Sequence, residues 1–190
     1  MLTIRHRVND IQMLVDTPRN TGIEIDIRTL GGELMLAHDP FIKGPLFKDW
    51  IKHYDHKCLV LNTKEDGLED ILLDILKERQ IVDFFFLDQP FPTIRKTIIK
   101  GCSKIALRFS EFEDLSLLQN MKGQCDWVWV DSFQTYSHDL DTLFQIKEMG
   151  FKLCFVSPEL QGRYCDNEVS EILNACAQLN ADAICTKNFR

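Results

Sequence analysis

The chain of 190 residues lacks several features that mark whole classes of protein. It has no apolar run approaching the roughly 18 residues that a membrane span requires. It has no cluster of basic residues, and 22 Lys and Arg against 29 Asp and Glu give a net charge of −7. Nucleic-acid phosphates are held by clustered Lys and Arg, so no nucleic-acid partner is expected. The first residues turn polar at once, unlike a signal peptide. We expect neither membrane insertion nor secretion.

Paired cysteines are also absent. The seven Cys occur singly along the chain, and none forms a Cys-x-x-Cys pair. An odd number without such pairs argues against a disulfide framework and against a thiolate zinc site. The sequence therefore predicts a cytoplasmic protein with free thiols.

What the sequence does contain is enough apolar material for a core, because 45% of its residues are hydrophobic. The length fits a single domain, 1–190. Short runs rich in β-branched and aromatic residues alternate with amphipathic helical stretches. The eight predicted strands are Leu2–Val8, Gly22–Thr29, Lys57–Asn62, Val82–Leu87, Lys104–Phe109, Trp127–Asp131, Lys152–Ser157 and Ala183–Thr186.

This alternation predicts an α/β fold built from parallel βαβ units. Eight units close naturally into a (β/α)₈ TIM barrel, although about 250 residues are typical. An open doubly wound sheet is the alternative, but no glycine-rich phosphate loop follows the first strand. Since Arg190 comes just after the eighth strand, we expect a compact barrel that lacks the last helix.

Acidic residues alternate with isoleucines in the second predicted strand, Gly22–Thr29. Glu24 and Asp26 share one face, and the isoleucines share the other. On a half-exposed strand this pattern means only that polar residues face solvent. In a barrel the apolar face meets the helices, so the carboxylates point inward and need compensation. A divalent cation such as Mg²⁺ or Ca²⁺, which prefers oxygen ligands, would provide it.

Two histidines flank that strand. His6 ends the first strand, and His38 follows a Gly31-Gly32 turn and a short returning strand. A lone histidine is usually structural or simply exposed. Two of them near a Glu-x-Asp strand can act as general base and general acid, because each can take or give a proton near neutral pH.

The spacing of these residues resembles a known superfamily. His6-Arg7 is followed after eighteen residues by Glu24-x-Asp26, and His38-Asp39 comes fourteen residues after Glu24. This resembles the glycerophosphodiester phosphodiesterase and phosphatidylinositol phospholipase C superfamily. The resemblance implies a (β/α)₈ barrel with two catalytic His, a divalent metal on acidic ligands and a phosphodiester substrate with a neighbouring hydroxyl. Lys64 resembles the Lys of the superfamily's Glu-x-Lys motif.

The chain departs from the superfamily in three places. Val8 stands where the family has Gly, and Asn62 stands where it has a third metal carboxylate. The long insertion that glycerophosphodiesterases carry after the second His is missing. The resemblance thus implies a compact member in which Asn62 joins Glu24 and Asp26 as a neutral metal ligand.

Further polar residues end the remaining predicted strands, where barrel enzymes place their sites. Arg108 and Glu159 are two of these, and they join Arg7 and Lys64 as predicted substrate-binding residues. Arg and Lys suit a phosphate group, because one offers a bidentate fork and the other a compact charge. Strand ends are also polar simply because loops face water.

The sequence as a whole predicts a metal-dependent phosphodiesterase that acts on a small soluble phosphodiester. His6 and His38 would exchange protons, and the resemblance implies attack by a neighbouring hydroxyl to give a cyclic phosphate. The alternative is a non-catalytic barrel that binds a phospho-ligand and has a weakened metal site. A metal-independent lyase is less favoured, because the Glu24-x-Asp26 pair remains.

Overall fold

The computed structural model describes residues 1–188 and combines parallel strands with the helices that connect them. Its strands are β1 (Leu2–Arg5), β2 (Gly22–Leu30), β3 (Glu33–Leu36), β4 (Cys58–Thr63), β5 (Phe84–Leu87), β6 (Ala106–Phe109), β7 (Trp127–Val130), β8 (Lys152–Val156) and β9 (Ala183–Thr186). Its helices are α1 (Ile11–Val15), α2 (Phe47–Trp50), α3 (Glu69–Glu78), α4 (Phe91–Ile99), α5 (Leu115–Met121), α6 (Leu140–Glu148) and α7 (Asp166–Gln178), with 3₁₀ turns at η1 (Ile51–His53) and η2 (Pro158–Gln161).

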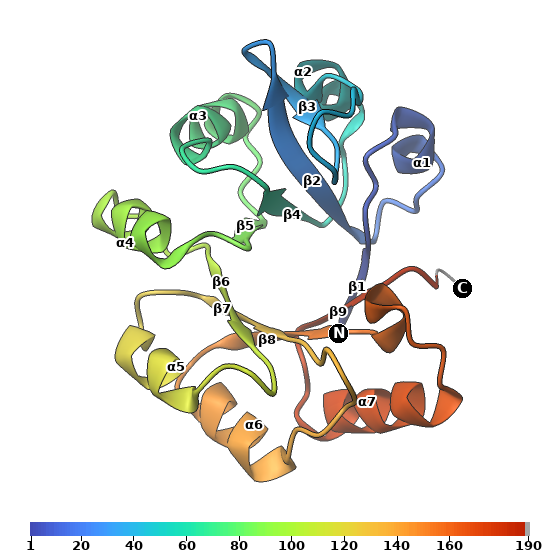
Figure 1. Ribbon diagram of the computed structural model, residues 1–190, viewed down its shortest axis with the longest axis vertical. Helices are drawn as coiled ribbons and strands as arrows, with labels where there is room; N and C mark the ends of the chain where they lie inside the picture. The colour runs from blue at the N-terminus through green and yellow to red at the C-terminus, as the bar shows by residue number, and fades with distance from the viewer. Residues whose placement is uncertain (189–190) are drawn as a thin grey trace. The chain divides into compact units, whose positions relative to one another are not determined.

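The chain divides into two compact units. The first comprises Met1–Ile4 together with the chain from Ser103 onward, and the second comprises Arg5–Cys102. In the first unit, β6 to β9 pair in sequence order as parallel neighbours, and β1 follows β9. Helices α5, α6 and α7 lie along one side of these strands (Figure 1).

The second unit holds β2, β4 and β5, which pair in that order as parallel neighbours. β3 folds back antiparallel to β2 through the turn at Gly31 and Gly32, where both glycines have positive φ. The register between β2 and β4 sets Asp26 opposite Asn62. Two polar residues from separate strands are thereby neighbours.

The core of the second unit explains why β2 is buried on both faces. Ile23, Ile25 and Ile27 are fully buried and pack in a cluster with Phe47 and Trp50. The acidic residues on the opposite face of β2 are equally inaccessible to solvent. Burial of the apolar face stabilises the strand at about 25 cal/mol per Å², whereas burial of carboxylates needs compensation.

The fold class predicted from the sequence is confirmed: eight parallel strands alternate with helices in the manner of a compact (β/α)₈ barrel. Among the described residues, no helix follows β9. The single-domain assignment stays a prediction.

One local prediction was wrong, and one helix was not predicted. The first strand ends at Arg5 instead of Val8, because Arg7 takes a left-handed conformation with φ of 52°. The chain then forms α1, which the sequence analysis missed. Asp10 caps that helix, since its side chain accepts from the N–H groups of Gln12 and Met13.

Candidate active site

The two acidic residues of β2 form the centre of the candidate site. Glu24 and Asp26 are fully buried, with side chains only 1% exposed. They share the face of β2 opposite the isoleucines, as the alternation predicted. Two carboxylates so close together in a dry environment repel each other, so the groups around them decide which charges they carry.

Glu24 has one oxygen in a short hydrogen bond and one without a partner. The backbone N–H of Arg7 donates to Oε2 at 2.6 Å, and Nε2 of His6 lies 3.8 Å from the same oxygen. Oε1 is buried and has no hydrogen-bond partner among the described residues. The left-handed turn at Arg7 directs this N–H toward Glu24 and is a conformation that costs roughly 1 kcal/mol or more.

The ionisation of Glu24 is strongly perturbed. Burial raises the pKa of Glu24 to about 8, and the nearby charge of Asp26 acts in the same direction. The Arg7 N–H, the Lys64 ammonium and the Asn62 amide lower the pKa but do not outweigh burial. Without a cation, the carboxyl group is therefore protonated at neutral pH. A cation at this position would compensate the charged form.

Asp26 is held by groups from three segments. Asn9 makes a reciprocal pair with it: Nδ2 donates to Oδ2 at 2.9 Å, and the backbone N–H of Asp26 donates to Asn9 Oδ1 at 2.9 Å. Lys64 Nζ lies 3.1 Å from Oδ1, and Arg7 Nε lies 3.7 Å from Oδ2. The Asp26 carboxylate is thus fixed in orientation, and its negative charge is compensated by the side chains of Lys64 and Arg7.

Asn62 contributes a second oxygen without a partner. It is 6% exposed, and its Oδ1 is buried with no hydrogen-bond partner among the described residues. Buried polar atoms without partners are rare in folded proteins, and each one suggests an absent ligand, ion or water. The oxygens of Glu24, Asp26 and Asn62 match the donor type that Mg²⁺ or Ca²⁺ prefers.

The donor set is nevertheless small. The part of the chain that the structure describes contains no cluster of three His, Cys, Asp or Glu residues arranged to hold a metal ion. Lys64, near Asp26, also lies 3.7 Å from Asp88. The residues present therefore fit a cation held by two carboxylates and one neutral amide, which is a weaker site than three carboxylates would make.

His38 lies at the start of the loop that follows β3. Its Nδ1 is 2.8 Å from Oδ1 of Asp39, and its carbonyl accepts from Arg28 Nε at 3.0 Å. The hydrogen bond from His38 lowers the pKa of Asp39, and the charges of His38, Arg7 and Arg28 lower it further. A carboxylate beside Nδ1 favours the tautomer that carries its proton on that nitrogen.

Arg108 and Glu159, both predicted to bind substrate, belong to the other unit and have partners within it. Arg108 pairs with the buried carboxylate of Asp131, and its guanidinium lies 5.3 Å from the ring centroid of Phe133. Glu159 is 2% exposed and accepts from the hydroxyls of Ser157 and Thr186 and from Lys187 N. Burial alone would raise the pKa of Glu159, but these hydrogen bonds lower it below its usual value.

Sequence reasoning missed one member of the site. Asn9 was not selected from the sequence, yet it makes two hydrogen bonds with Asp26. Its position three residues after His6 was a usable signal, because the same turn must bring both residues to β2. Lys64 and Arg7, which were predicted to bind substrate, lie within 3.1 and 3.7 Å of Asp26, and their role in substrate binding stays a prediction.

The fold and this cluster define a class: a (β/α)₈ barrel with buried carboxylates and an adjacent His near its early strand ends. No protein-family model matches the chain, and no curated protein matches its sequence. Solved structures do match its fold.

Three of these structures cover nearly the whole chain. A glycerophosphodiester phosphodiesterase from Agrobacterium tumefaciens str. C58 has a TM-score of 0.69 and 10% identity, over 99% of this chain and 96% of its own. A glycerophosphoryl diester phosphodiesterase from Parabacteroides distasonis ATCC 8503 has a TM-score of 0.69 and 12% identity, and the match covers 98% of this chain and 82% of its own. Another A. tumefaciens str. C58 protein, assigned to the same activity, has a TM-score of 0.73 and 9% identity, and the match covers 99% of this chain and 94% of its own. At such identities the likeness establishes the fold.

Proposed function

We propose that this protein is a phosphodiesterase that uses a divalent cation and acts on a small phosphodiester. The observation that carries the proposal is the buried pair Glu24 and Asp26, which lies beside His6 and includes an oxygen without a partner. The fold shared with the phosphodiesterases above supports the same conclusion. Neither fold nor site alone would suffice, because one fold hosts many functions.

Glu24, Asp26 and Asn62 would hold the cation, Mg²⁺ or Ca²⁺. The cation would supply Lewis-acid stabilisation of charge on a phosphoryl oxygen. Lys64 and Arg7 add positive charge at the same place, within 3.1 and 3.7 Å of Asp26. An anionic phosphate would thus be attracted to a site where the charge of Asp26 is compensated.

His6 and His38 would carry the proton transfers. One imidazole takes the proton of a substrate hydroxyl next to the phosphate, and that oxygen attacks phosphorus. The other gives a proton to the departing alcohol, so the products are a cyclic phosphate and a free alcohol. Asp39 orients His38, because it lies 2.8 Å from Nδ1. Arg108 and Glu159 remain proposed substrate contacts, although their partners within their own unit also give them a structural role.

A cytoplasmic location fits the thiols. None of the seven Cys belongs to a disulfide, and five of them are buried. Among the described residues, no helix is both long and apolar enough to span a bilayer.

A second candidate is a phospho-ligand-binding protein without turnover. Asn62 replaces an anionic ligand, and Lys64 lies at hydrogen-bonding distance from Asp26. Both features weaken cation binding and leave a site able to bind phosphate. The presence of His6 and His38 favours the enzyme.

Kinetics of histidine variants test the proposal. The substrates are an activated phosphodiester and a glycerophosphodiester, each assayed with Mg²⁺ and with Ca²⁺. We expect His6→Ala and His38→Ala each to lower turnover by about 10²-fold or more, the usual scale for positioned proton transfer. The double variant should lose little more than the worse single variant. His53→Ala, at an exposed position in η1, is the control and should keep full activity.

Two results would reject the enzyme. Full turnover in both single variants would mean that other groups carry the chemistry. Absence of turnover in the wild type, with retained binding of a phosphate analogue, would favour the binding protein.

A further inference from the structure

Arg28 shares the face of β2 that carries Glu24 and Asp26. Its side chain is 19% exposed, and its guanidinium donates to two backbone carbonyls. Nε donates to His38 O at 3.0 Å, and Nη1 donates to Lys64 O at 3.3 Å. Arg28 therefore connects the segment of a proposed proton-transfer residue to the segment of a proposed phosphate-binding residue.

The two connected segments leave β2 on opposite edges. β3 pairs with one edge of β2 and β4 with the other, since Ile27 is opposite a residue of each strand. Backbone hydrogen bonds hold both segments to β2 next to Arg28: Ala37 N donates to Asp26 O at 3.1 Å, and Lys64 N donates to Ile27 O at 3.0 Å. The guanidinium of Arg28 thus spans the end of β2 from one neighbouring segment to the other.

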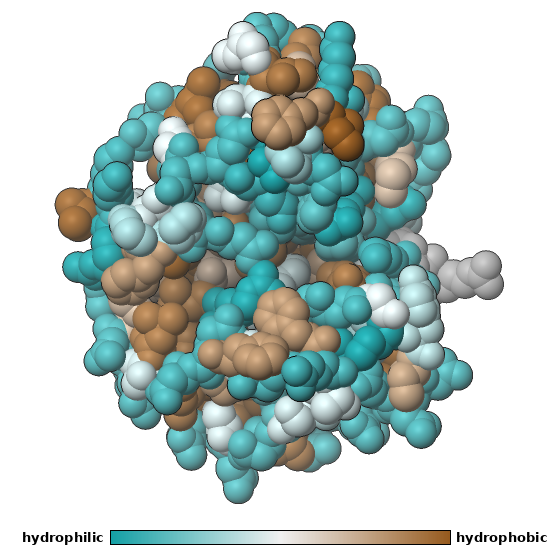
Figure 2. All heavy atoms as spheres, viewed as in Figure 1, coloured by the Kyte–Doolittle hydropathy of each residue, from teal (hydrophilic) through white to brown (hydrophobic). Residues whose placement is uncertain are grey.

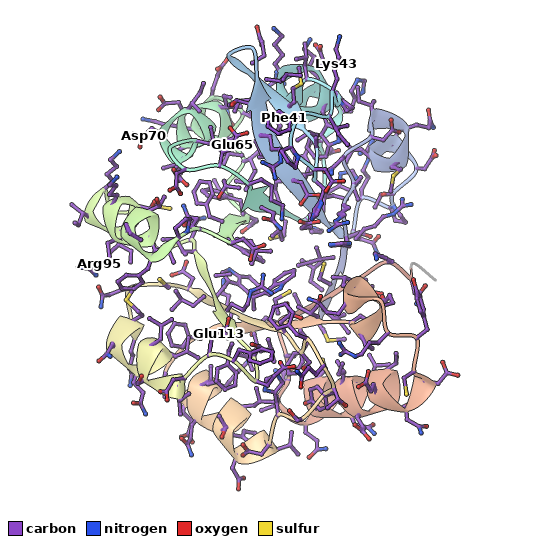
Figure 3. The ribbon with its side chains drawn as sticks, viewed as in Figure 1. Phe41, Lys43, Glu65, Asp70, Arg95 and Glu113 are labelled. Carbon is purple, nitrogen blue, oxygen red and sulfur yellow. The ribbon has the colours of Figure 1, made fainter. Side chains whose placement is uncertain are left out.

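Glu65 lies beside this guanidinium but makes no close ion pair with it. Its Oε1 is 3.9 Å from Arg28 Nη1, and its Oε2 accepts from the backbone N–H and the hydroxyl of Thr29. Figure 3 labels Glu65 beside β2, and Figure 2 shows many hydrophilic side chains on the visible face of this unit. A partly exposed pair at this distance contributes little. The two carbonyls are therefore the main polar partners of Arg28.

The fold by itself does not require a bridge between these carbonyls. His38 and Lys64 are both partly exposed, so water could satisfy their backbone oxygens. Holding one long side chain in a single geometry also costs rotamer entropy. What the bridge provides is spacing, because the guanidinium is planar and its N–H donors have fixed directions. Two hydrogen bonds from one such group fix two chain segments relative to each other.

We propose that Arg28 is a positioning residue that sets the spacing between His38 and Lys64. The inference rests on the proposed phosphodiesterase function and adds a residue to it. Proton transfer requires the imidazole to lie within hydrogen-bond reach of the proton it moves. A misplacement of about 1 Å can lower a rate about 100-fold. Arg28 acts through the backbone of the two residues, so that the imidazole and the ammonium keep one arrangement.

Nuclear magnetic resonance of the full chain tests the bridge without any substrate. Arg28→Met keeps an unbranched side chain and removes its donors. We expect it to shift the carbonyl ¹³C signals of His38 and Lys64 and to move the ring signals of His38 toward those of a free histidine. The matched control is Arg19→Met, because the exposed Arg19 donates to His53 O at 3.2 Å. It should shift the His53 carbonyl signal and leave those of His38 and Lys64 unchanged.

Binding and turnover connect the bridge to function. In titrations with inorganic phosphate in the presence of Mg²⁺, Arg28→Met should weaken affinity about threefold or more. The same substitution should have no further effect in Lys64→Met, because Arg28 acts on the anion through Lys64. Turnover of an activated phosphodiester should fall about tenfold or more in Arg28→Met. Arg19→Met should keep wild-type affinity and turnover.

Three outcomes would overturn the proposal. The first is unchanged carbonyl and ring signals of His38 in Arg28→Met. The second is an equal loss of turnover in Arg19→Met. The third is a loss of phosphate affinity in Arg28→Met that adds in full to the loss in Lys64→Met, because Arg28 would then contact the anion by itself.

Failure of the proposed function gives a different result. A wild type with neither turnover nor phosphate binding would reject the phosphodiesterase and, with it, the role of Arg28 in the reaction. The resonance signals would still show whether Arg28 holds the two segments, so the two failures are distinguishable. Thermal unfolding verifies that each variant folds. If Arg28→Met does not fold, Arg28→Gln takes its place in every comparison, because its shorter side chain cannot donate to both carbonyls.

Discussion

Two buried glutamates, one in each unit, show opposite ways of placing a carboxylate in a dry environment. Glu159 is 2% exposed, and both of its oxygens accept hydrogen bonds from its neighbours. Glu24 is fully buried, and one of its oxygens has no hydrogen-bond partner. The pKa of Glu159 is lowered by its hydrogen bonds, whereas burial raises the pKa of Glu24 to about 8. A buried carboxylate whose two oxygens both accept hydrogen bonds stabilises the fold. A buried carboxylate with an unpartnered oxygen is suited to binding a ligand.

The largest effect we expect from this contrast is on the pH dependence of stability. Glu24 has a raised folded-state pKa, so the folded protein binds more protons than the unfolded chain between about pH 4.5 and 8. Without metal, the contribution of Glu24 to stability is present at low pH and is lost as the pH rises through this window. The loss is on the order of 3 kcal/mol. Denaturant titrations at pH 5 and pH 8 in a chelator measure it.

Glu24→Gln is the control for this pH effect. The amide does not titrate, so the variant should show a smaller decrease in stability across the same window. The same decrease in both proteins would contradict the assignment to Glu24.

The second prediction compares the same substitution at the two sites. Glu159→Gln should destabilise the fold by about 2 kcal/mol, because an NH₂ group replaces an acceptor that faces hydroxyl and N–H donors. Glu24→Gln at pH 8 should leave the stability of the metal-free protein unchanged or raise it. Thermal unfolding of both variants provides the comparison. A larger loss of stability in Glu24→Gln than in Glu159→Gln would contradict our interpretation of the two sites.

The third prediction concerns Asn9, which orients Asp26. Asn9→Ala removes both hydrogen bonds and should weaken cation binding about tenfold, the lower end of the effects seen when residues that orient metal ligands are removed. Isothermal titration with Mg²⁺ measures it. Asn20→Ala, at an exposed position, is the control and should bind like wild type. Unchanged Mg²⁺ affinity in Asn9→Ala would show that Asn9 does not contribute to the cation site.

Much of the fold followed from local pattern. Alternation of Ile with Glu and Asp in β2 predicted two distinct faces, and the structure buries both. Gly31-Gly32 predicted the turn into β3. The end of β1 could not be predicted, because a left-handed Arg7 has no signature in its side chain. Helix α1 was missed because a helix of five residues shows too little periodicity.

The site was predictable by residue type but not by contact. Glu24, Asp26, Lys64 and Arg7 were all selected from the sequence, and the structure brings them together. Local sequence does not show whether a carboxylate at the end of a strand accepts hydrogen bonds. At Glu159, one donor is the hydroxyl of Thr186, which lies 27 residues further along the chain.

The central claim is that the unpartnered oxygens of Glu24 and Asn62 hold a divalent cation. Calorimetric titration with Mg²⁺ and Ca²⁺, with and without a phosphate analogue, tests it most directly in the wild type and in Asn62→Glu. We expect weak binding by the wild type that the analogue tightens, because two carboxylates leave the bound cation free to attract an anion. Asn62→Glu should bind more tightly without the analogue, since it adds a third charge. Equal, tight binding by both proteins would exclude Asn62 from the site, and no binding by either protein under either condition would contradict the claim.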